Sequence, residues 1–91
     1  MVIEWSPRAR QNLESIIARI SIDSPRGAKR IADRITKRVE DLKQFPEQGV
    51  ARPGRIYRLD VAHTPYFVVY RVSEKGVTIL SVLHGRRNRR S

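Results

Sequence analysis

Apolar residues recur at helical spacing along the first half of the chain and predict two helices. The first stripe predicts a helix over residues 7–20 and comprises Ala9, Leu13, Ile16, Ile17 and Ile20. The second predicts a helix over residues 25–44 and comprises Ala28, Ile31, Ala32, Ile35, Val39 and Leu42. Ser6-Pro7 and Ser24-Pro25 are each typical of an N-cap followed by the first helical residue. Residues 20–23 are expected to break the first helix, and this short connection predicts an antiparallel helical hairpin.

The remaining segments carry patterns typical of strands. Residues 2–5 predict a short first strand, and residues 56–61, 66–72 and 77–83 predict three strands after the helices. Ser73-Glu74-Lys75-Gly76 predicts a hairpin with a glycine where a left-handed residue is wanted. Residues 45–55 contain two prolines and two glycines and are expected to form a loop. The order β-α-α-β-β-β, with helices segregated from strands, indicates the α+β class.

The length and the absent residue types restrict the possible classes of protein. The chain has 91 residues, so we expect a single domain over residues 1–91. Cysteine is absent, which excludes disulfides, thiolate metal sites and a cysteine nucleophile. We expect neither a signal peptide nor a membrane span, since no apolar run approaches roughly 18 residues, and these features fit a cytoplasmic protein. His63 and His84 are far apart, so we expect no metal site and no cofactor.

The charge of the chain is strongly positive and unevenly distributed. The formal net charge is +10. Residues 1–50 hold ten Lys and Arg against seven Asp and Glu, whereas residues 51–91 hold nine against two. Arginine outnumbers lysine fifteen to four, and the planar guanidinium suits phosphate or carboxylate partners. The expected partner is therefore nucleic acid, an enzyme that handles nucleic acid, or an acidic protein.

Several short motifs follow one another along nearly the whole chain. Those of the first half are Trp5-Ser6 with Ala9 and Leu13, Ser24-Pro25 with Ala28, and Leu42-x-x-Phe45-Pro46-x-x-Gly49. Those of the second half are Arg52-Pro53-Gly54, Thr64-Pro65-Tyr66, Val69-Tyr70-Arg71-Val72 and Val82-Leu83-His84-Gly85-Arg86-Arg87. No single motif is specific, but their order and spacing resemble the ParE branch of the RelE/ParE superfamily, the toxins of type II toxin–antitoxin systems.

The resemblance implies a two-helix hairpin packed on a mostly antiparallel sheet. It also implies a cognate antitoxin, a small acidic protein with a DNA-binding half, whose C-terminal segment wraps the toxin. We expect the antitoxin to contact the helical hairpin through Leu13, Ile17, Arg30, Arg34 and Arg38. The three arginines repeat every four residues, which destabilises an isolated helix by ~0.2–0.5 kcal/mol per pair. The alternative is that the hairpin neutralises them itself through Glu14, Asp33 or Asp41.

The resemblance implies two possible targets, because members of the ParE branch poison DNA gyrase and members of the RelE branch cut mRNA on the ribosome. A metal-free ribonuclease needs a base for the 2′-hydroxyl, a cation for the phosphorane and an acid for the leaving oxygen. Phe67 stands where the ribonucleases carry an arginine. We therefore predict a gyrase inhibitor that acts by binding, without catalysis of its own. The alternative is a ribosome-dependent mRNA endoribonuclease that uses His84, Arg87, Arg58 and Arg71.

The predicted contacts with the target are basic and lie in the second half of the chain. They are Arg71, Arg86, Arg87, Arg89 and Arg90. The alternative for residues 86–91 is a flexible, solvated basic tail, and the alternative for His84 is a capping role at a strand end. A plain nucleic-acid-binding module is a third hypothesis, which predicts tight DNA binding with a steep salt dependence.

Overall fold

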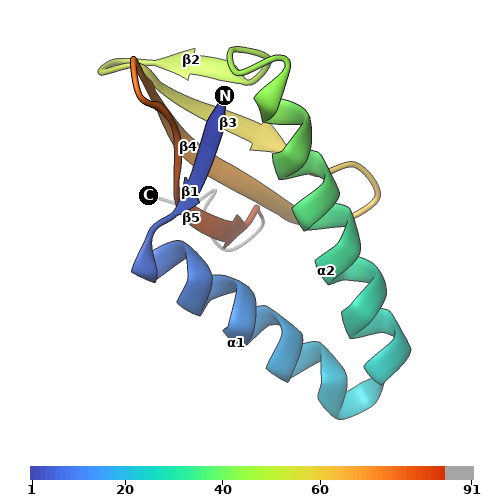
Figure 1. The fold of residues 1–91 in the computed structure, drawn as a ribbon. Coiled ribbons are helices and arrows are strands. Elements are labelled where there is room, and N and C mark those ends of the chain that lie inside the picture. The colour runs from blue at the N-terminus through green and yellow to red at the C-terminus, as the bar shows by residue number, and fades with distance from the viewer. Residues whose placement is uncertain (86–91) are drawn as a thin grey trace.

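The structure, a computed structural model, describes residues 1–85 of the chain. Two helices follow the first strand, and four further strands follow the helices (Figure 1). The elements are β1 (Val2–Trp5), α1 (Pro7–Asp23), α2 (Pro25–Glu40), the 3-10 turn η1 (Asp41–Lys43), β2 (Val50–Arg52), β3 (Ile56–Asp60), β4 (Tyr66–Ser73) and β5 (Gly76–His84). This order confirms the predicted α+β class, with one strand more than the sequence pattern predicted.

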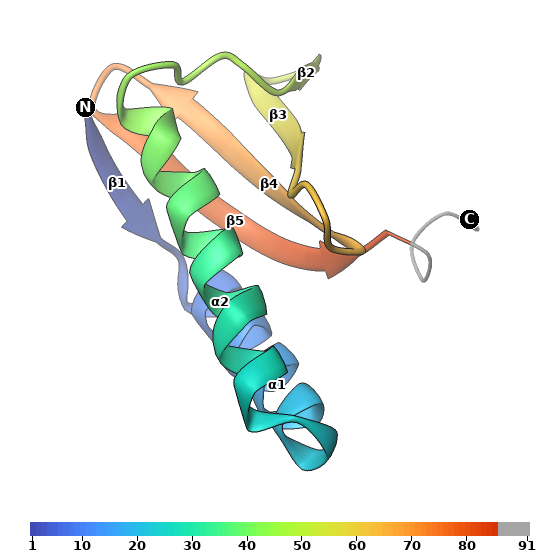
Figure 2. The same ribbon diagram turned by 90° about the vertical axis from the view of Figure 1, so that its right-hand side faces the viewer.

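The five strands form one mixed sheet in the order β1-β5-β4-β3-β2. The three pairings among β2, β3, β4 and β5 are antiparallel, and β1 lies parallel to β5. The two helices form a hairpin whose tip extends well past the strands (Figures 1 and 2). The predicted arrangement, a helical hairpin on a mostly antiparallel sheet, is therefore confirmed.

Serine caps both helices, as the sequence predicts. The Ser6 hydroxyl accepts a hydrogen bond from the Ala9 amide at 3.0 Å and donates one to the Leu80 carbonyl at 3.1 Å, so it also fastens α1 to β5. The Ser24 hydroxyl accepts from the Gly27 amide at 2.9 Å. The predicted break at residues 20–23 is wrong, because α1 continues to Asp23 and Ser24 alone makes the connection. The isoleucines there are compatible with the helix, and Ile22 is 82% exposed beside the tip.

The second helix ends earlier than its apolar stripe predicts. Regular α-helix stops at Glu40, and the backbone tightens into the 3-10 turn η1 rather than continuing to residue 44. Pro46 disfavours helical geometry at Phe45, so the helix cannot extend beyond this last turn. Leu42 in η1 is fully buried, which explains why the apolar stripe extends past the α-helix.

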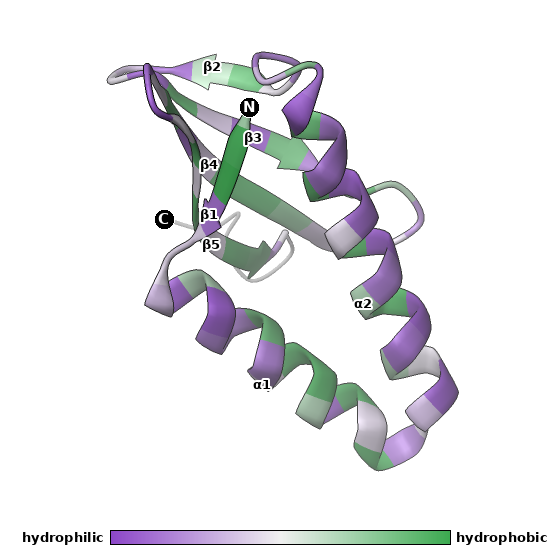
Figure 3. Cartoon of the chain, viewed as in Figure 1, coloured by the Kyte–Doolittle hydropathy of each residue, from purple (hydrophilic) through white to green (hydrophobic). Residues whose placement is uncertain are grey.

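The hydrophobic core lies between the helices and one face of the sheet. Val68, Tyr70 and Val72 alternate along β4 toward this core, and α1 and α2 contribute Ala9, Ile35 and Val39. Trp5, Leu13 and Ile16 pack around its border while staying partly exposed. In Figure 3 the strands are largely hydrophobic, whereas the outward surface of α2 is mostly hydrophilic. The other face of the sheet carries no helix (Figure 2), and we call it the open face.

Residues 50–52 form an edge strand where the sequence predicted a loop. β2 pairs with β3, with Val50 opposite Arg58 and Arg52 opposite Ile56. All three of its residues are exposed, so the segment has no alternating apolar signal to read. The Tyr70 hydroxyl accepts a hydrogen bond from the Gly49 amide at 3.0 Å and so ties this edge to the core. A β-carbon on Gly49 would lie 2.6 Å from the Arg58 carbonyl oxygen, so a larger residue would displace the strand.

The hairpin between β4 and β5 is formed as predicted, and its glycine has a second role. Gly76 has φ +144° and opens β5 opposite Val2 of β1. A β-carbon at this position would clash with the Val2 carbonyl oxygen. Gly76 therefore permits both the turn and the close approach of the parallel strand.

Candidate functional site

The open face of the sheet brings basic and apolar side chains together. Strand register places Arg58 beside Val69, Ile56 beside Arg71, and Phe67 beside Leu83. These side chains point away from the core because they alternate with the buried residues of the same strands. A shallow hollow of about 340 Å³ is lined by Ile56, Arg58, Phe67, Val69 and Leu83, together with Arg52 of β2 and Tyr57. Arg71 does not line it but lies next to it, opposite Ile56. We call this set the open-face patch: Arg52, Ile56, Arg58, Phe67, Val69, Arg71 and Leu83.

Arg58 is fixed at the centre of the patch by two contacts. Its guanidinium carbon lies 3.8 Å from the centroid of the Phe67 ring. Its Nε donates to the Asp60 carboxylate at 3.2 Å. A cation over an aromatic ring at an exposed site gains ~0.5–1 kcal/mol. Phe67 is only 6% exposed but lies outside the core cluster, so it serves as a platform for an arginine of the neighbouring strand.

The patch carries more positive than negative charge. β2, β3 and β4 each contribute one arginine, namely Arg52, Arg58 and Arg71, against the single carboxylate of Asp60. Arg71 is exposed, and no ion pair involves it or Arg52 among residues 1–85. Two unpaired guanidinium groups beside an apolar floor can bind carboxylates or phosphates while burying hydrophobic surface.

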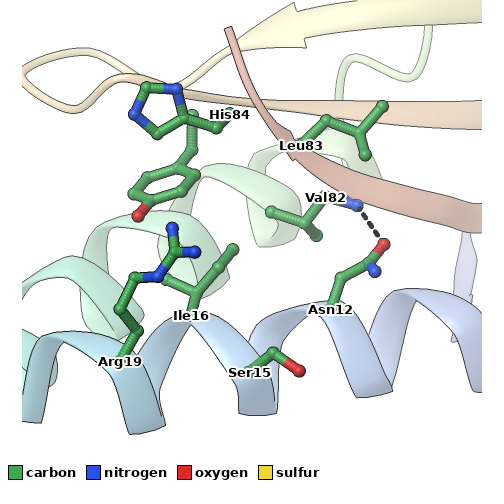
Figure 4. A pocket seen from close by; sticks show the side chains of 8 residues that line it. Asn12, Ser15, Ile16, Arg19, Val82, Leu83 and His84 are labelled. Atoms are coloured by element: carbon green, nitrogen blue, oxygen red, sulfur yellow. Dashed lines mark hydrogen bonds between the residues drawn. The ribbon is translucent and has the colours of Figure 1, made fainter. Parts of the chain in front are cut away.

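His84 lies on the opposite side of the sheet from this patch. Its ring meets Tyr66 edge to face, with centroids 5.3 Å apart. Both residues line a cleft of about 290 Å³ between α1 and the ends of β4 and β5. On α1, Arg19 lies across from His84, and Asn12 lies further along, opposite Val82 (Figure 4). We call this the α1 cleft. Asn12 accepts a hydrogen bond from the Val82 amide at 3.0 Å and so holds α1 to β5 there.

The residues of the alternative ribonuclease set are therefore not gathered at one place. Arg58 and Arg71 point from the open face, while His84 points into the α1 cleft behind the sheet. The fourth member, Arg87, lies outside the described residues. His63 is exposed in the turn before β4 and has φ +66°, which confirms it as a turn residue.

The predicted antitoxin-binding residues fall into two groups on the helical hairpin. Leu13 and Ile17 are partly exposed on α1, and Leu13 borders a groove beside Ile3 and Trp5 of β1. Arg30 and Arg34 are exposed on α2, and neither forms an ion pair within the described part of the chain. The hairpin is therefore apolar along one margin and basic along another.

Arg38 differs from the other two arginines of the α2 stripe because it has partners within the chain. Its Nη1 donates to the Gln48 side chain at 2.6 Å and lies 3.5 Å from the Asp41 carboxylate. The predicted relief by Asp41 is thus confirmed for this arginine. Asp33 instead pairs with Lys29 at 3.3 Å.

The remaining predicted target contacts, Arg86, Arg87, Arg89 and Arg90, lie outside the described residues, as does the predicted basic tail at 86–91. Across residues 1–85 no group of three His, Cys, Asp or Glu side chains is placed to hold a metal ion. Within the same range, every helix is too short or too polar to cross a membrane.

Two residues of the candidate sites, Arg52 and Arg19, could not be identified from the sequence. Arg52 was expected in a loop, and only the pairing of β2 with β3 brings it beside Ile56. Arg19 carried no signal, because one exposed arginine on an amphipathic helix is ordinary. The face on which Phe67 lies could have been predicted from the sequence. Residues 67, 69 and 71 alternate with the buried Tyr66, Val68 and Tyr70, so they point to the opposite face of β4.

Comparison with known proteins agrees with the fold and with the motifs. The sequence profile described as "ParE toxin of type II toxin-antitoxin system, parDE" matches residues 3–89. A relative from Sinorhizobium fredii, "Putative toxin Y4kP", is 41% identical over 85 residues, covering 90% of this chain and 85% of that protein. "Toxin RelE2" of Caulobacter vibrioides is 31% identical over 85 residues, covering 93% and 96%.

A solved structure is similar along almost the full length of the chain. A chain from "Chromosomal ParDE TA system from P. aeruginosa" superposes with a TM-score of 0.80 at 26% identity, covering 92% of this chain and 95% of that one. The profile match, the two relatives and this structural likeness agree with one another. The protein belongs to the ParE toxin family of type II toxin–antitoxin systems.

Proposed function

We propose that this protein is a cytoplasmic toxin that inhibits DNA gyrase by binding it, without making or breaking bonds itself. The observation that carries the proposal is the open-face patch, in which Arg52 and Arg58 line an apolar hollow and Arg71 lies beside it, opposite Ile56. Such a patch can bury surface against a protein while engaging acidic groups or DNA phosphates. On β2, β3 and β4 the only carboxylate is Asp60, which is already paired with Arg58, so this part of the face lacks an evident general base.

In this proposal Arg71 is the leading contact with the target. Arg52 and Arg58 join it from the neighbouring strands, and Arg86, Arg87, Arg89 and Arg90 extend the same basic character toward the C-terminus. Arg58 is held in place before binding, so it loses little conformational freedom when the target arrives. Arg71 and Arg52 supply charge that attracts an acidic or phosphate-bearing surface.

A toxin of this class implies an antitoxin partner, and we propose that it is a small acidic DNA-binding protein that docks on the helical hairpin. Leu13 and Ile17 would receive apolar side chains along α1. Arg30 and Arg34 would pair with carboxylates of the antitoxin, because neither forms an ion pair in the described part of the toxin. Arg38 would contribute less, because Gln48 and Asp41 already engage it.

Ribosome-dependent mRNA cleavage remains the second candidate, and the relative called "Toxin RelE2" is the observation that favours it. It requires His84, Arg87, Arg58 and Arg71 to act on one scissile phosphate. Primer extension on a translated message would then give discrete cuts that vanish in a His84→Ala, Arg87→Ala double variant. Uncut message in the presence of the wild-type toxin excludes this candidate.

The leading proposal is tested with purified toxin in a gyrase supercoiling assay. We expect loss of supercoiling and accumulation of cleaved DNA. Arg71→Glu should weaken both effects, whereas Arg8→Glu, an equal charge change on exposed α1, should not. Unchanged supercoiling at saturating wild-type toxin would overturn the gyrase proposal, and equal loss of inhibition in both variants would overturn the role of the patch.

A further inference from the structure

The α1 cleft exists because α1 is fastened to the sheet at only one end. The Ser6 amide donates to the Ile79 carbonyl at 2.9 Å, and Asn12 accepts from the Val82 amide at 3.0 Å. β1 pairs with β5 only as far as Ile79, so no strand borders the following residues of β5 on that side. The helix then extends away from the sheet toward the hairpin tip (Figure 2). The space that opens between the helix and β5 is the α1 cleft.

The two walls of the cleft carry a guanidinium and an imidazole. Arg19 projects from α1, and His84 lies across from it on β5 (Figure 4). No described residue that lines the cleft is acidic, and Arg19 has no ion-pair partner within residues 1–85. Ile16 and Val82 add apolar side chains to the lining. The cleft is thus matched to a short aliphatic stem that ends in a negative charge.

We propose that the α1 cleft binds an aspartate or glutamate side chain carried by an extended segment of the antitoxin, with Arg19 as the principal determinant of specificity. The inference rests on the proposed neutralisation by an antitoxin and adds a contact apart from Leu13, Ile17 and the arginines of α2. Arginine holds a carboxylate with two parallel hydrogen bonds, which fixes orientation as well as charge.

A carboxylate fits the cleft better than a nucleotide does. Tyr66, the tyrosine of the cleft, is only 8% exposed and already meets His84 edge to face. It therefore offers little surface for a base to stack on, and stacking supplies much of the binding energy for single strands. A volume of about 290 Å³ suits one or two side chains of a peptide.

Charge reversal with a matched control tests the proposal. The toxin is purified with the antitoxin encoded beside it, and the affinity of the refolded partners is measured by calorimetry. We expect Arg19→Glu to weaken binding by about tenfold or more, the loss of one charge-assisted contact. Arg8→Glu changes the net charge equally on the same helix but lies outside the cleft, and it should leave the affinity within about twofold.

Site-specific cross-linking identifies the occupant. A photoreactive phenylalanine replaces Ser15, which lines the cleft, or Glu14, which is exposed and does not line it. We expect the photoreactive residue at position 15 to capture an antitoxin peptide that contains Asp or Glu. Replacing that acidic residue of the antitoxin with Arg should restore its binding to the Arg19→Glu toxin. A captured peptide without an acid, or captured nucleic acid, overturns the proposal.

The two proposals fail in different ways. If the wild-type toxin does not bind the adjacent antitoxin at all, the proposed neutralisation fails. If the wild type binds, but Arg19→Glu and Arg8→Glu bind it with equal affinity, only the proposed role of the cleft fails.

Discussion

The two faces of the sheet use the same two-residue alternation for opposite purposes. The face beneath the helices buries aliphatic side chains and the rings of Tyr66 and Tyr70 in one cluster. The open face covers its one large ring, Phe67, with the guanidinium of Arg58 instead of with a helix. One face therefore stabilises the fold, and the other shields its apolar surface with charge and keeps it available to a partner.

The largest expected effect is a difference in the free energy of unfolding between variants of the two faces. Ile35→Ala removes a fully buried side chain from the core and should lower the free energy of unfolding by about 2–5 kcal/mol. Ile56→Ala, on the half-exposed open face, should lower it by less than about 1.5 kcal/mol. Urea denaturation with similar m-values provides the measurement. Equal losses would mean that the open face contributes to the core after all.

A smaller effect is expected where the core face meets the edge strand. Tyr70→Phe removes the acceptor of the Gly49 amide and should destabilise the protein by about 1–3 kcal/mol. The test is thermal unfolding combined with hydrogen exchange of the Gly49 amide. If exchange of that amide does not accelerate, the tyrosine does not hold β2 in place.

Tyr70 also predicts a dependence on pH. Burial raises the pKa of its hydroxyl above the ordinary 10.0, and this outweighs the lowering effect of the Gly49 hydrogen bond. The unfolded chain then loses the phenolic proton first, so this contribution to stability is complete below about pH 10 and is lost as the pH rises through the folded pKa. Wild type should lose more stability than Tyr70→Phe over this alkaline range, as followed by urea midpoints. Parallel curves would contradict the assignment.

On the open face the expected effect is on binding rather than folding. Arg71→Glu should weaken the proposed inhibition of gyrase by about tenfold, while the free energy of unfolding stays within about 0.5 kcal/mol of wild type. Dose-response curves for supercoiling, paired with urea midpoints, separate the two quantities. A variant that loses stability instead of inhibition would place Arg71 among the structural residues.

The smallest effect concerns the contact between Arg58 and Phe67. A double-mutant cycle with Arg58→Met and Phe67→Leu should give a coupling energy of about 0.5–1 kcal/mol. The coupling energy is obtained from the unfolding free energies of the wild type, the two single variants and the double variant. Strict additivity would show that the ring and the guanidinium are merely neighbours.

Local signals were sufficient for the helices and for most strands. Ser6 and Ser24 marked both N-caps because the capping bond of a hydroxyl before proline is local, to the amide three residues further on. The long strand at β4 was clear from its β-branched and aromatic run. The pattern failed at residues 20–23, where isoleucine and aspartate are poor but acceptable helix formers and Ser24 decides the end.

The remaining features depend on residues far apart in sequence. β2 forms because Val50 meets Arg58 across a turn, and its exposed side chains give no periodic signal. The separation of His84 from Arg58 follows from the register of three strands and from the irregularity between Val69 and Tyr70. Residues of one candidate set can therefore fall on opposite faces even when the sequence correctly places them on strands, as it did Arg58 and Arg71, or at a strand end, as it did His84.

The parallel pairing of β1 with β5 has a consequence for when this protein becomes harmful. Among residues 1–85, β1 pairs only with β5, which is made much later, and the Ser6 hydroxyl reaches a carbonyl 74 residues further along the chain. A growing polypeptide cannot complete this sheet while its final strand is still being made. The complete sheet, and any activity that depends on it, therefore exists only after β5 has been synthesised.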